Sequence, residues 1–416
     1  MSHHVSSHLY KWNAGPRRTG HKPDIGVTMK HKISVVLAVT LAALLAGTAP
    51  AQAGAQTTVT LEAAASDHDV VTSAATTKVI LDTDLRYNTD DMYTLMFLLQ
   101  ADAAGYIDLL GVTTAPPGVR TEVEAQMGLS MLEKVERTDV PLYVGQDRPL
   151  DGRWYKDSDF VEMWNLRLRD NMKADLDPNS EVDYSSMQLG GQYDPATHAG
   201  VTTKAQPEPA WQFMTKQVKK YPGQVTIMSI GAVTNTALAI KHDPNFAANT
   251  AGIYYMGGVT PEDGSNGSGS FNWGSDATAV NVALNADFPK QVLIPSEIAN
   301  TVKLTKPVMD EIVAADTPVA ELLKDVAYPV WEANPQRVQS FWDAVTPAVL
   351  MIPSITDRTA VRYMTLADEP GPFLGVIRQW TEGRQPAHLN PIDVVYTVDN
   401  DEYWDFVTEI LTTNYN

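Results

Sequence analysis

The sequence contains no cysteine among its 416 residues. This absence excludes disulfide bonds and any metal site built on thiolates. Basic side chains are also few, because 31 Lys and Arg residues stand against 50 Asp and Glu residues, and the formal net charge is -19. Without a basic stripe, the chain is not expected to bind a nucleic acid polymer. It also lacks a Walker loop, a helix-opening Gly-x-Gly-x-x-Gly and a Gly-x-Ser-x-Gly elbow, which excludes the common nucleotide-binding and serine hydrolase motifs.

Long apolar runs are missing too, except for one near the N-terminus. Residues 29–32 are mostly basic, residues 33–45 are apolar, and residues 51–53 read Ala-Gln-Ala, which is the order of a secretory signal peptide. No later run has the length needed to span a bilayer. We therefore interpret residues 29–53 as a signal peptide and residues 1–28 as a non-native or disordered extension. The mature protein is expected to be secreted and extracellular, without membrane attachment.

The main feature that is present is a group of acids directly after a short apolar strand. Residues 79–81 are apolar, Asp82, Asp84, Asp90 and Asp91 follow, and residues 92–99 have helical apolar spacing. The acids therefore lie where a strand becomes a helix, a common ligand crevice in α/β sheets. Carboxylates this close raise one another's pKa, and a divalent cation removes that penalty. Oxygen ligands favour calcium or magnesium, while the alternative is an N-capping cluster on a solvated loop.

Strands and helices alternate along the rest of the chain, which predicts an α/β fold. We expect an open, mostly parallel, Rossmann-like sheet with helices on both faces. Residues 54–77 are interpreted as a flexible lead-in and residues 78–416 as one domain. Within it, residues 151–204 break the alternation and are interpreted as an inserted lid. The expected strands are 79–81, 107–113, 142–144, 225–229, 252–256, 291–294, 361–365 and 393–398. One expected helix begins at residue 90, and the others cover 120–136, 208–220, 235–241, 276–286, most of 306–349, and 402–411.

A set of ordered motifs carries a resemblance to a known family. They are Leu-Asp-Thr-Asp at 81–84 with Asp90-Asp91, Gly-Val-Thr-Thr at 111–114, Val-Pro-Leu-Tyr-Val-Gly at 140–145, Gly-Ala-Val-Thr-Asn-Thr-Ala-Leu-Ala at 231–239, Met-Gly-Gly at 256–258, Phe271-Asn272 with Asp276, Trp342-Asp343, and Val-Asp-x-Asp-x-x-Trp-Asp-Phe at 398–406. Each motif is weak alone, but in this order the chain resembles the inosine-uridine-preferring nucleoside hydrolase family, as a secreted bacterial-type member, from about residue 78 to 411. The resemblance implies the nucleoside hydrolase architecture for this domain.

The resemblance implies a calcium ion and a role for each matching residue. Calcium would be held by Asp84, Asp91, Asp343 and the backbone carbonyl of Thr234, while Asp84 would also be the general base, Asp90 would bind ribose hydroxyls and Asp82 would support the cluster. Water would then attack C1′ of a ribonucleoside or related N-riboside directly, releasing the base and ribose without a covalent intermediate. Asp343 has a local alternative as a helix N-cap.

The sequence also departs from the family pattern. Five residues lie between Asp84 and Asp90, and Arg86 and Tyr87 among them are expected to alter the pocket rim. Trp342 replaces a histidine often proposed to protonate the departing base; tryptophan stacks on a nucleobase but donates no acidic proton.

Three further positions bear on the sugar and on the last metal ligand. Ser270 replaces an acid that contacts the sugar, whereas Asn272 remains as a ribose contact or, alternatively, a turn residue. The segment His388-Leu389-Asn390-Pro391 is rejected as the site of the last metal ligand, because it falls inside the family's closing strand-turn-strand-helix unit.

Three function classes follow from these residues. The first is a calcium-dependent N-glycosyl hydrolase whose partner is a small nucleoside. The second is a non-catalytic secreted nucleoside- or sugar-binding protein on the same fold, and the third is a hydrolase of a different glycoside. Family members are commonly oligomers, so the resemblance also allows a homo-oligomer. The residues leave the leaving-group acid and the base preference unassigned.

Overall fold

The computed structural model describes residues 76–117, 120–150, 152, 201–369 and 373–415. The extension at 1–28, the signal peptide at 29–53, nearly all of the lead-in and most of the 151–204 insertion lie outside the described residues. Those assignments therefore stay predictions. Within the described residues, no helix combines the length and the apolar character that a membrane span requires.

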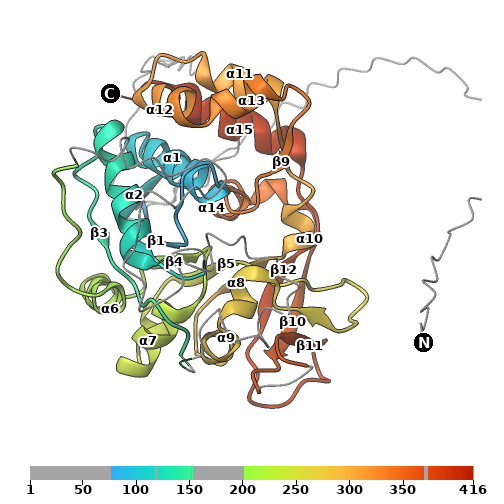
Figure 1. Ribbon diagram of the computed structural model, residues 1–416. Coiled ribbons are helices and arrows are strands. Elements are labelled where there is room, and N and C mark those ends of the chain that lie inside the picture. Colours follow the sequence, from blue (N-terminus) through green and yellow to red (C-terminus); the bar gives the residue numbers. More distant parts are fainter. Residues whose placement is uncertain (1–75, 118–119, 151, 153–200, 370–372, 416) are drawn as a thin grey trace, which may run out of the picture. The chain divides into compact units, whose positions relative to one another are not determined.

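One ten-stranded sheet organises the described chain (Figure 1). Its strands, in sheet order, are β3 (Leu142–Tyr143), β2 (Ile107–Thr114), β1 (Thr77–Thr83), β4 (Val225–Ser229), β5 (Gly252–Met256), β7 (Gln291–Ile294), β12 (Ile392–Val395), β10 (Thr359–Leu366), β11 (Val376–Trp380) and β6 (Gly267–Ser268). Strands β3 to β12 pair in parallel, and β10, β11 and β6 add an antiparallel edge. The expected α/β class and mostly parallel sheet are confirmed.

Helices cover both faces of this sheet (Figure 1). They are α1 (Asp90–Ala103), α2 (Thr121–Lys134), α6 (Ala210–Lys220), α7 (Thr234–His242), α8 (Ser270–Ser275), α9 (Ala277–Leu284), α10 (Ser296–Ala299), α11 (Lys306–Val313), α12 (Pro318–Val326), α13 (Tyr328–Ala333), α14 (Val345–Met351) and α15 (Asn400–Thr412), with short 3-10 turns at Ala247–Asn249 and Pro353–Ile355. Side chains of β1 alternate between two cores, as a strand requires. Val79 and Leu81 pack with α1, α14 and α15, and Ile80 packs with α6, α7 and α9.

The order of winding reverses at β1, which lies between β2 and β4. The chain builds outward from β1 to β2 and β3, and then returns to add β4, β5 and β7 on the other side. Asp82 pairs in register with Thr113 of β2 and Ser229 of β4, so the carboxyl ends of three parallel strands meet beside it. Such a switch point opens a crevice between the diverging crossovers, and the acid-rich loop after β1 lies at its mouth.

Several elements differ from the sequence expectation. The stretch 306–349 is not uniformly helical, because β9 (Val338–Ser340) pairs with β8 (Lys303–Thr305) in a separate two-stranded sheet. The Gly-rich segment at 264–269 contains β6, which pairs with β11. These strands are two or three residues long and their partners are remote in sequence, so no local periodicity announces them.

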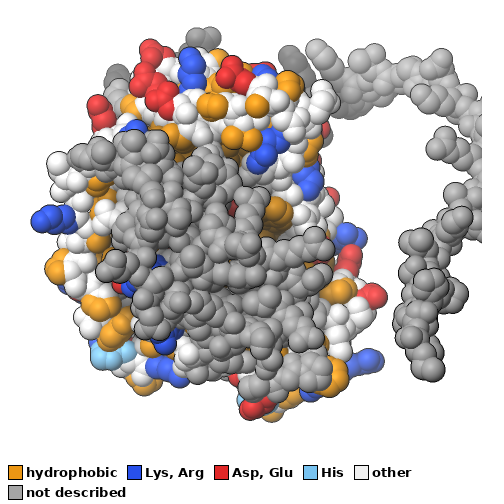
Figure 2. Space-filling model, viewed as in Figure 1, with side chains coloured by type: hydrophobic (Ala, Val, Ile, Leu, Met, Phe, Trp, Pro, Cys, Tyr) orange, Lys and Arg blue, Asp and Glu red, His pale blue; other side chains and the backbone are white. Residues whose placement is uncertain are grey.

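The charged surface agrees with the low content of basic residues. On the face shown in Figure 2, Asp and Glu side chains gather over the helices at the top of the view, and Lys and Arg side chains are spread around the edge of the described surface. This distribution is consistent with a small-molecule partner rather than a polyanion.

Candidate active site

A cavity of about 390 Å³ lies at the end of β1. Its walls come from the loop after β1, the start of α1, the end of β5 with α8, the start and end of α10, and the turn before α14. The lining residues are Asp84, Arg86, Asp90, Asp91, Met256, Ser270, Phe271, Asn272, Ser296, Asn300, Trp342 and Asp343. Six residues expected at the site, namely Asp84, Asp90, Asp91, Asn272, Trp342 and Asp343, are therefore brought together.

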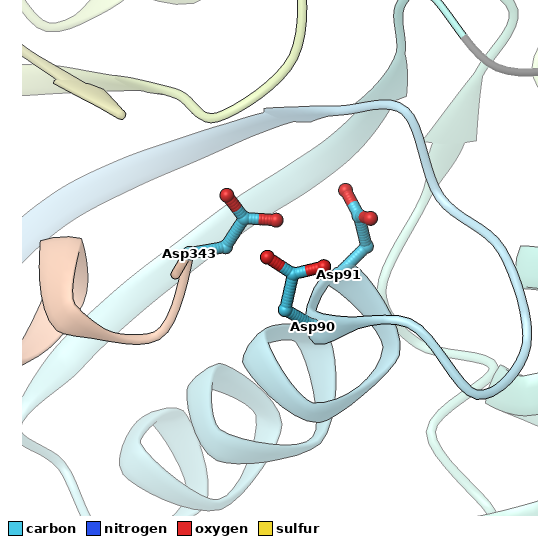
Figure 3. Close-up of side chains that lie close together, drawn as sticks. All are labelled: Asp90, Asp91 and Asp343. Carbon is cyan, nitrogen blue, oxygen red and sulfur yellow. The ribbon is translucent and has the colours of Figure 1, made fainter. Parts of the chain in front are cut away.

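Three carboxylates form the most compact part of the cavity. Asp90, Asp91 and Asp343 each offer an oxygen, and these atoms lie within 4.8 Å of one another (Figure 3). Asp90 and Asp91 open α1, while Asp343 comes from the turn before α14 and points back at them. This is a group that can hold a metal ion. Asp343 is thus part of the acid group and does not cap α14, whose N-cap is Ala344 without a side-chain hydrogen bond. Asn390 binds the carbonyl of Ala286 instead.

Hydroxyl groups fix Asp91 in place. Thr83 Oγ1 donates to Asp91 Oδ1 at 2.6 Å, and Thr89 Oγ1 lies 3.0 Å from Asp91 Oδ2. Thr89 precedes α1 in an extended conformation and also reaches the carbonyl of Arg86 at 2.8 Å, which closes the loop between Asp84 and Asp90. Two short polar side chains therefore hold the carboxylate rigidly while leaving lone pairs directed into the cavity.

Burial raises the pKa of every acid in this group, and like charge adds to that rise for Asp90 and Asp343. Burial raises the pKa of Asp343 well above its ordinary range, and the charges of Asp90, Asp91 and Asp84 raise it further. Burial, followed by the charge of Asp91, raises the pKa of Asp90 to about 7. The pKa of Asp91 is raised by burial, although Arg86 and the two threonines oppose that shift. Without a cation, full ionisation of this group is therefore disfavoured.

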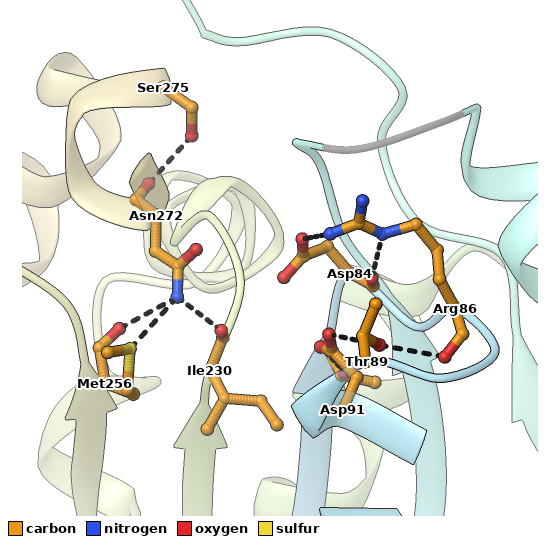
Figure 4. Close-up of polar contacts among 9 residues, drawn as sticks. Asp84, Arg86, Thr89, Asp91, Ile230, Met256, Asn272 and Ser275 are labelled. Carbon is orange, nitrogen blue, oxygen red and sulfur yellow. Dashed lines mark hydrogen bonds and ion pairs between the residues drawn. The ribbon is translucent and has the colours of Figure 1, made fainter. Parts of the chain in front are cut away.

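Asp84 lies beside the three-carboxylate group and forms an ion pair with Arg86. Arg86 Nη2 lies 3.2 Å from Asp84 Oδ2, and Arg86 Nε donates to the Asp84 carbonyl at 3.3 Å (Figure 4). Burial and the charge of Asp91 raise the pKa of Asp84 well above its ordinary value, and Arg86 acts against them. Gly231 passes behind this residue, where an added Cβ would lie 2.9 Å from the Asp84 amide nitrogen. Only glycine lets the β4–α7 loop approach so closely.

Asp82 and Thr234 support the site from outside the cavity. Asp82 is fully buried, and its Oδ1 accepts from Thr113 Oγ1 at 2.7 Å and from Asn235 Nδ2 at 2.8 Å. It thereby connects β1, β2 and α7. The supporting role for the acid cluster that the resemblance implies for Asp82 stays a prediction. Thr234 begins α7 and donates its hydroxyl to Asp276 Oδ2 at 2.8 Å.

Asn272 occupies the opposite wall and has a fixed orientation. Its Nδ2 donates to the carbonyls of Ile230 at 2.6 Å and Met256 at 3.2 Å, so its Oδ1 turns toward the side of the site that holds Asp84 (Figure 4). Ser270, two residues earlier, has a positive φ of 52° and accepts from the Gly258 amide at 2.8 Å. Asn272 thus offers an acceptor to the cavity, which its alternative role as a turn residue does not require.

The enlarged loop after Asp84 contributes one rim residue rather than two. Arg86 lines the cavity as expected. The expectation for Tyr87 was wrong, because this side chain is 1% exposed and donates its hydroxyl to Ser130 Oγ at 3.1 Å. The loop therefore packs its aromatic residue into the core beneath α1 and α2, which anchors the loop and leaves Arg86 facing the ligand.

Comparison with known proteins agrees with this geometry. Residues 79–405 match the family model for inosine-uridine preferring nucleoside hydrolase. The chain belongs to this family. It is therefore an N-glycosyl hydrolase, the kind of enzyme that hydrolyses the N-glycosidic bond of ribonucleosides.

Individual relatives cover nearly the same span of this nucleoside hydrolase. A probable uridine nucleosidase 1 of Oryza sativa subsp. japonica is 26% identical over 343 residues, covering 80% of this chain and 96% of the relative. Uridine nucleosidase 1 of Arabidopsis thaliana is 26% identical over 341 residues, covering 79% and 91%. A solved plant nucleoside hydrolase has a TM-score of 0.61 at 22% identity, covering 81% and 99%, and so shares the fold. These plant proteins lend no support to the narrower bacterial-type resemblance.

Sequence reasoning missed two lining residues of this nucleoside hydrolase, Ser296 and Asn300, and it named Met256 and Phe271 only within motifs, without a role. Ser296 and Asn300 lie in and after α10, which follows β7. The signal that points to them is positional: in a parallel sheet, the residues after each strand's carboxyl end share one edge. Asn300 carries no local motif, so only that rule places it near the acids.

Proposed function

We propose that this nucleoside hydrolase depends on calcium and cleaves ribonucleosides by direct attack of water on C1′. The observation that carries the proposal is the convergence of Asp84 with the three carboxylates of Asp90, Asp91 and Asp343 in one cavity. Four acids in a buried site are costly unless a cation or a positively charged transition state balances them.

The donor set fits calcium. Each acidic residue offers carboxylate oxygens as ligand atoms, and the described residues that line the cavity include no His or Cys. Hard oxygen ligands suit calcium or magnesium, and a site with several carboxylates suits the larger and more flexible shell of calcium. Asp84, Asp91 and Asp343 would hold the ion. The family resemblance adds the backbone carbonyl of Thr234, although Thr234 is not among the residues that line the cavity. When bound, calcium gathers water and the sugar diol together and lowers the pKa of that water.

The protein residues would then share the work of the reaction. Asp84 takes the proton of the attacking water, for which its position between the acid group and Arg86 is suitable. Asp90 accepts hydrogen bonds from ribose hydroxyls, and Asn272 accepts another through its free Oδ1. The C1′–N bond breaks, its electron pair leaves with the base, and the sugar passes through an oxocarbenium-like state that the surrounding carboxylates stabilise.

A release assay tests this proposal directly. The plant relatives are uridine nucleosidases by name, so uridine is the first substrate to test, with inosine and cytidine beside it. Reducing-sugar release is measured after treatment with a chelator, and again after adding back calcium or magnesium. We expect release that the chelator abolishes and that calcium restores better than magnesium. Tight nucleoside binding without ribose release in saturating calcium would contradict the proposal and favour a binding protein; release from non-nucleoside ribosides alone would favour a different glycosidase.

We also propose that the protein is exported. The proposal rests on the basic, apolar and small-residue segments of 29–53. Expression of the full chain in a secreting host, followed by N-terminal sequencing of the protein in the medium, should identify Gly54 as the first residue. Retention of uncleaved protein inside the cells would contradict export.

A further inference from the structure

One part of the cavity has no role in the reaction as described so far. Trp342 Nε1 donates to Asn300 Oδ1 at 2.8 Å, joining two lining residues that are 42 positions apart. The same oxygen accepts from Ser340 Oγ at 3.2 Å, and Lys303 Nζ donates to that Ser340 hydroxyl at 2.6 Å. The amide of Asn300 is thus held by two donors on one side.

The direction of these hydrogen bonds is fixed from both ends. An indole N–H and an ammonium group donate only, so Asn300 must present its oxygen to Trp342, and the Ser340 hydroxyl must pass its proton toward Asn300. The Nδ2 group of Asn300 therefore points away from them. Among the described residues, it has no hydrogen-bond acceptor, and Asn300 is exposed at the cavity wall. Two oriented N–H donors stand free near the N–H edge of the Trp342 indole.

This arrangement bears on how the departing base is stabilised. The departing base accumulates negative charge as the C1′–N bond breaks, yet the described lining residues include no His, Lys or Tyr to protonate it. In the proposed reaction, the acids that are present bind the metal ion and the sugar. A fixed hydrogen-bond donor placed where charge develops lowers the barrier without transferring a proton. Trp342 supplies a π-face on which the base stacks next to that donor.

We propose that Asn300 recognises the base of a pyrimidine ribonucleoside and stabilises it as the leaving group; this inference rests on the proposed function. In pyrimidines a carbonyl lies next to the glycosidic nitrogen, and it accepts the charge that the broken bond releases. Purines have no carbonyl at that position. The Asn300 amide donates to this oxygen, the water proton goes to Asp84, and the base departs as an anion that solvent protonates.

The test compares two leaving groups in the same enzyme. Asn300→Asp keeps an oxygen for Trp342 and Ser340 but removes both free donors. We expect kcat for uridine to fall by about 10²-fold or more, as for loss of an oxyanion donor. Hydrolysis of para-nitrophenyl riboside should fall by no more than about threefold, because nitrophenolate leaves without help. Inosine should lose less than uridine. Thr301→Ser, an exposed neighbour outside the cavity lining, is the matched control.

The outcomes separate this inference from the proposed function. An equal loss on uridine and on the nitrophenyl riboside would assign Asn300 a structural role and overturn the inference. Uridine turnover within about threefold of wild type would overturn it as well. A wild-type enzyme that hydrolyses only purine ribonucleosides would also contradict it while leaving the hydrolase assignment intact. A wild type inert on every riboside in calcium would contradict the proposed function itself.

Discussion

Two walls of the same cavity differ in charge and in burial. The acidic wall (Asp84, Asp90, Asp91 and Asp343) consists of largely buried carboxylates that threonine hydroxyls and an arginine hold in place. The amide–indole wall (Asn300 and Trp342) is more exposed. It is held by hydrogen bonds from the Trp342 indole and the Ser340 hydroxyl to the Asn300 amide oxygen. A cation and a sugar diol need rigid charge at fixed positions, whereas a planar base needs a surface and a few directed hydrogen bonds.

The difference also separates what the family keeps from what this chain changes. The acids Asp84, Asp90, Asp91 and Asp343, which the family resemblance assigns to the metal and to the ribose hydroxyls, all line the cavity. The substitutions fall outside this acidic wall, with Trp342 in the amide–indole wall and Ser270 beside Asn272. We infer that the acidic wall sets the reaction and that the amide–indole wall sets the substrate.

The largest effect should come from the acidic wall. Asp84→Asn removes the proposed general base, and we expect kcat on uridine to fall by at least about 10³-fold. The circular dichroism spectrum should stay unchanged, because the amide is nearly isosteric. Asp325→Asn, on the exposed surface of α12, is the control. A catalytically normal Asp84→Asn enzyme would refute the assignment.

Removing one ligand should separate metal binding from turnover. Asp343→Asn takes a charge from the three-carboxylate group, and we expect calcium affinity to fall by about 100-fold in titration calorimetry. Calcium affinity equal to that of wild type would exclude Asp343 as a ligand.

The raised pKa values predict the sign of the pH dependence. Asp90 has a folded-state pKa of about 7, above the ordinary value of 3.8, so between these limits the metal-free folded state binds more protons than the unfolded state. Stability without metal should therefore fall as pH rises from about 4 to 7. Calcium needs the ionised carboxylates, so its stabilising effect should grow over the same range.

Thermal unfolding measures this effect. At a calcium concentration about 100 times its Kd, binding contributes about 2.7 kcal/mol at pH 8, or a rise in Tm of roughly 4 °C for a domain of this size. At pH 5 the rise should be much smaller. An equal rise at both pH values would contradict the protonation of the empty group.

Arg86 offers a smaller test of the acidic wall. Its guanidinium adds positive charge next to Asp84, so Arg86→Met should tighten calcium binding by about three- to tenfold. Arg384→Met, on the exposed surface, should leave the calcium Kd unchanged. Weaker calcium binding in Arg86→Met would mean that Arg86 organises the loop rather than competing with the ion.

The smallest effect is expected from a conservative change in the amide–indole wall. Trp342→Phe keeps an aromatic face but loses the N–H that orients Asn300, and we expect KM for uridine to rise about three- to tenfold. Trp342→Ala removes the stacking surface as well and should raise KM by a further tenfold or so. Equal KM values for the two variants would show that the base does not stack there.

The sequence by itself determined the sheet class, the acid-rich loop and the family, because these depend on local patterns. Alternating apolar strands and amphipathic helices specify parallel pairing, and Asp82 to Asp91 follow one buried strand. Trp342-Asp343 was found through motif order. Tyr87 was misplaced because nothing in a polar loop distinguishes a rim residue from one that turns into the core.

Only the tertiary structure decided which residues face one another across the cavity. Asn300, Ser340 and Trp342 belong to segments that the sheet and the β8–β9 pair bring together, and Lys303 joins them from β8. A hydrogen bond is directional and short-ranged, so the role of an asparagine depends on which neighbour takes its oxygen. Composition and spacing record the residue types, but the fold sets which end of the Asn300 amide remains free for a base.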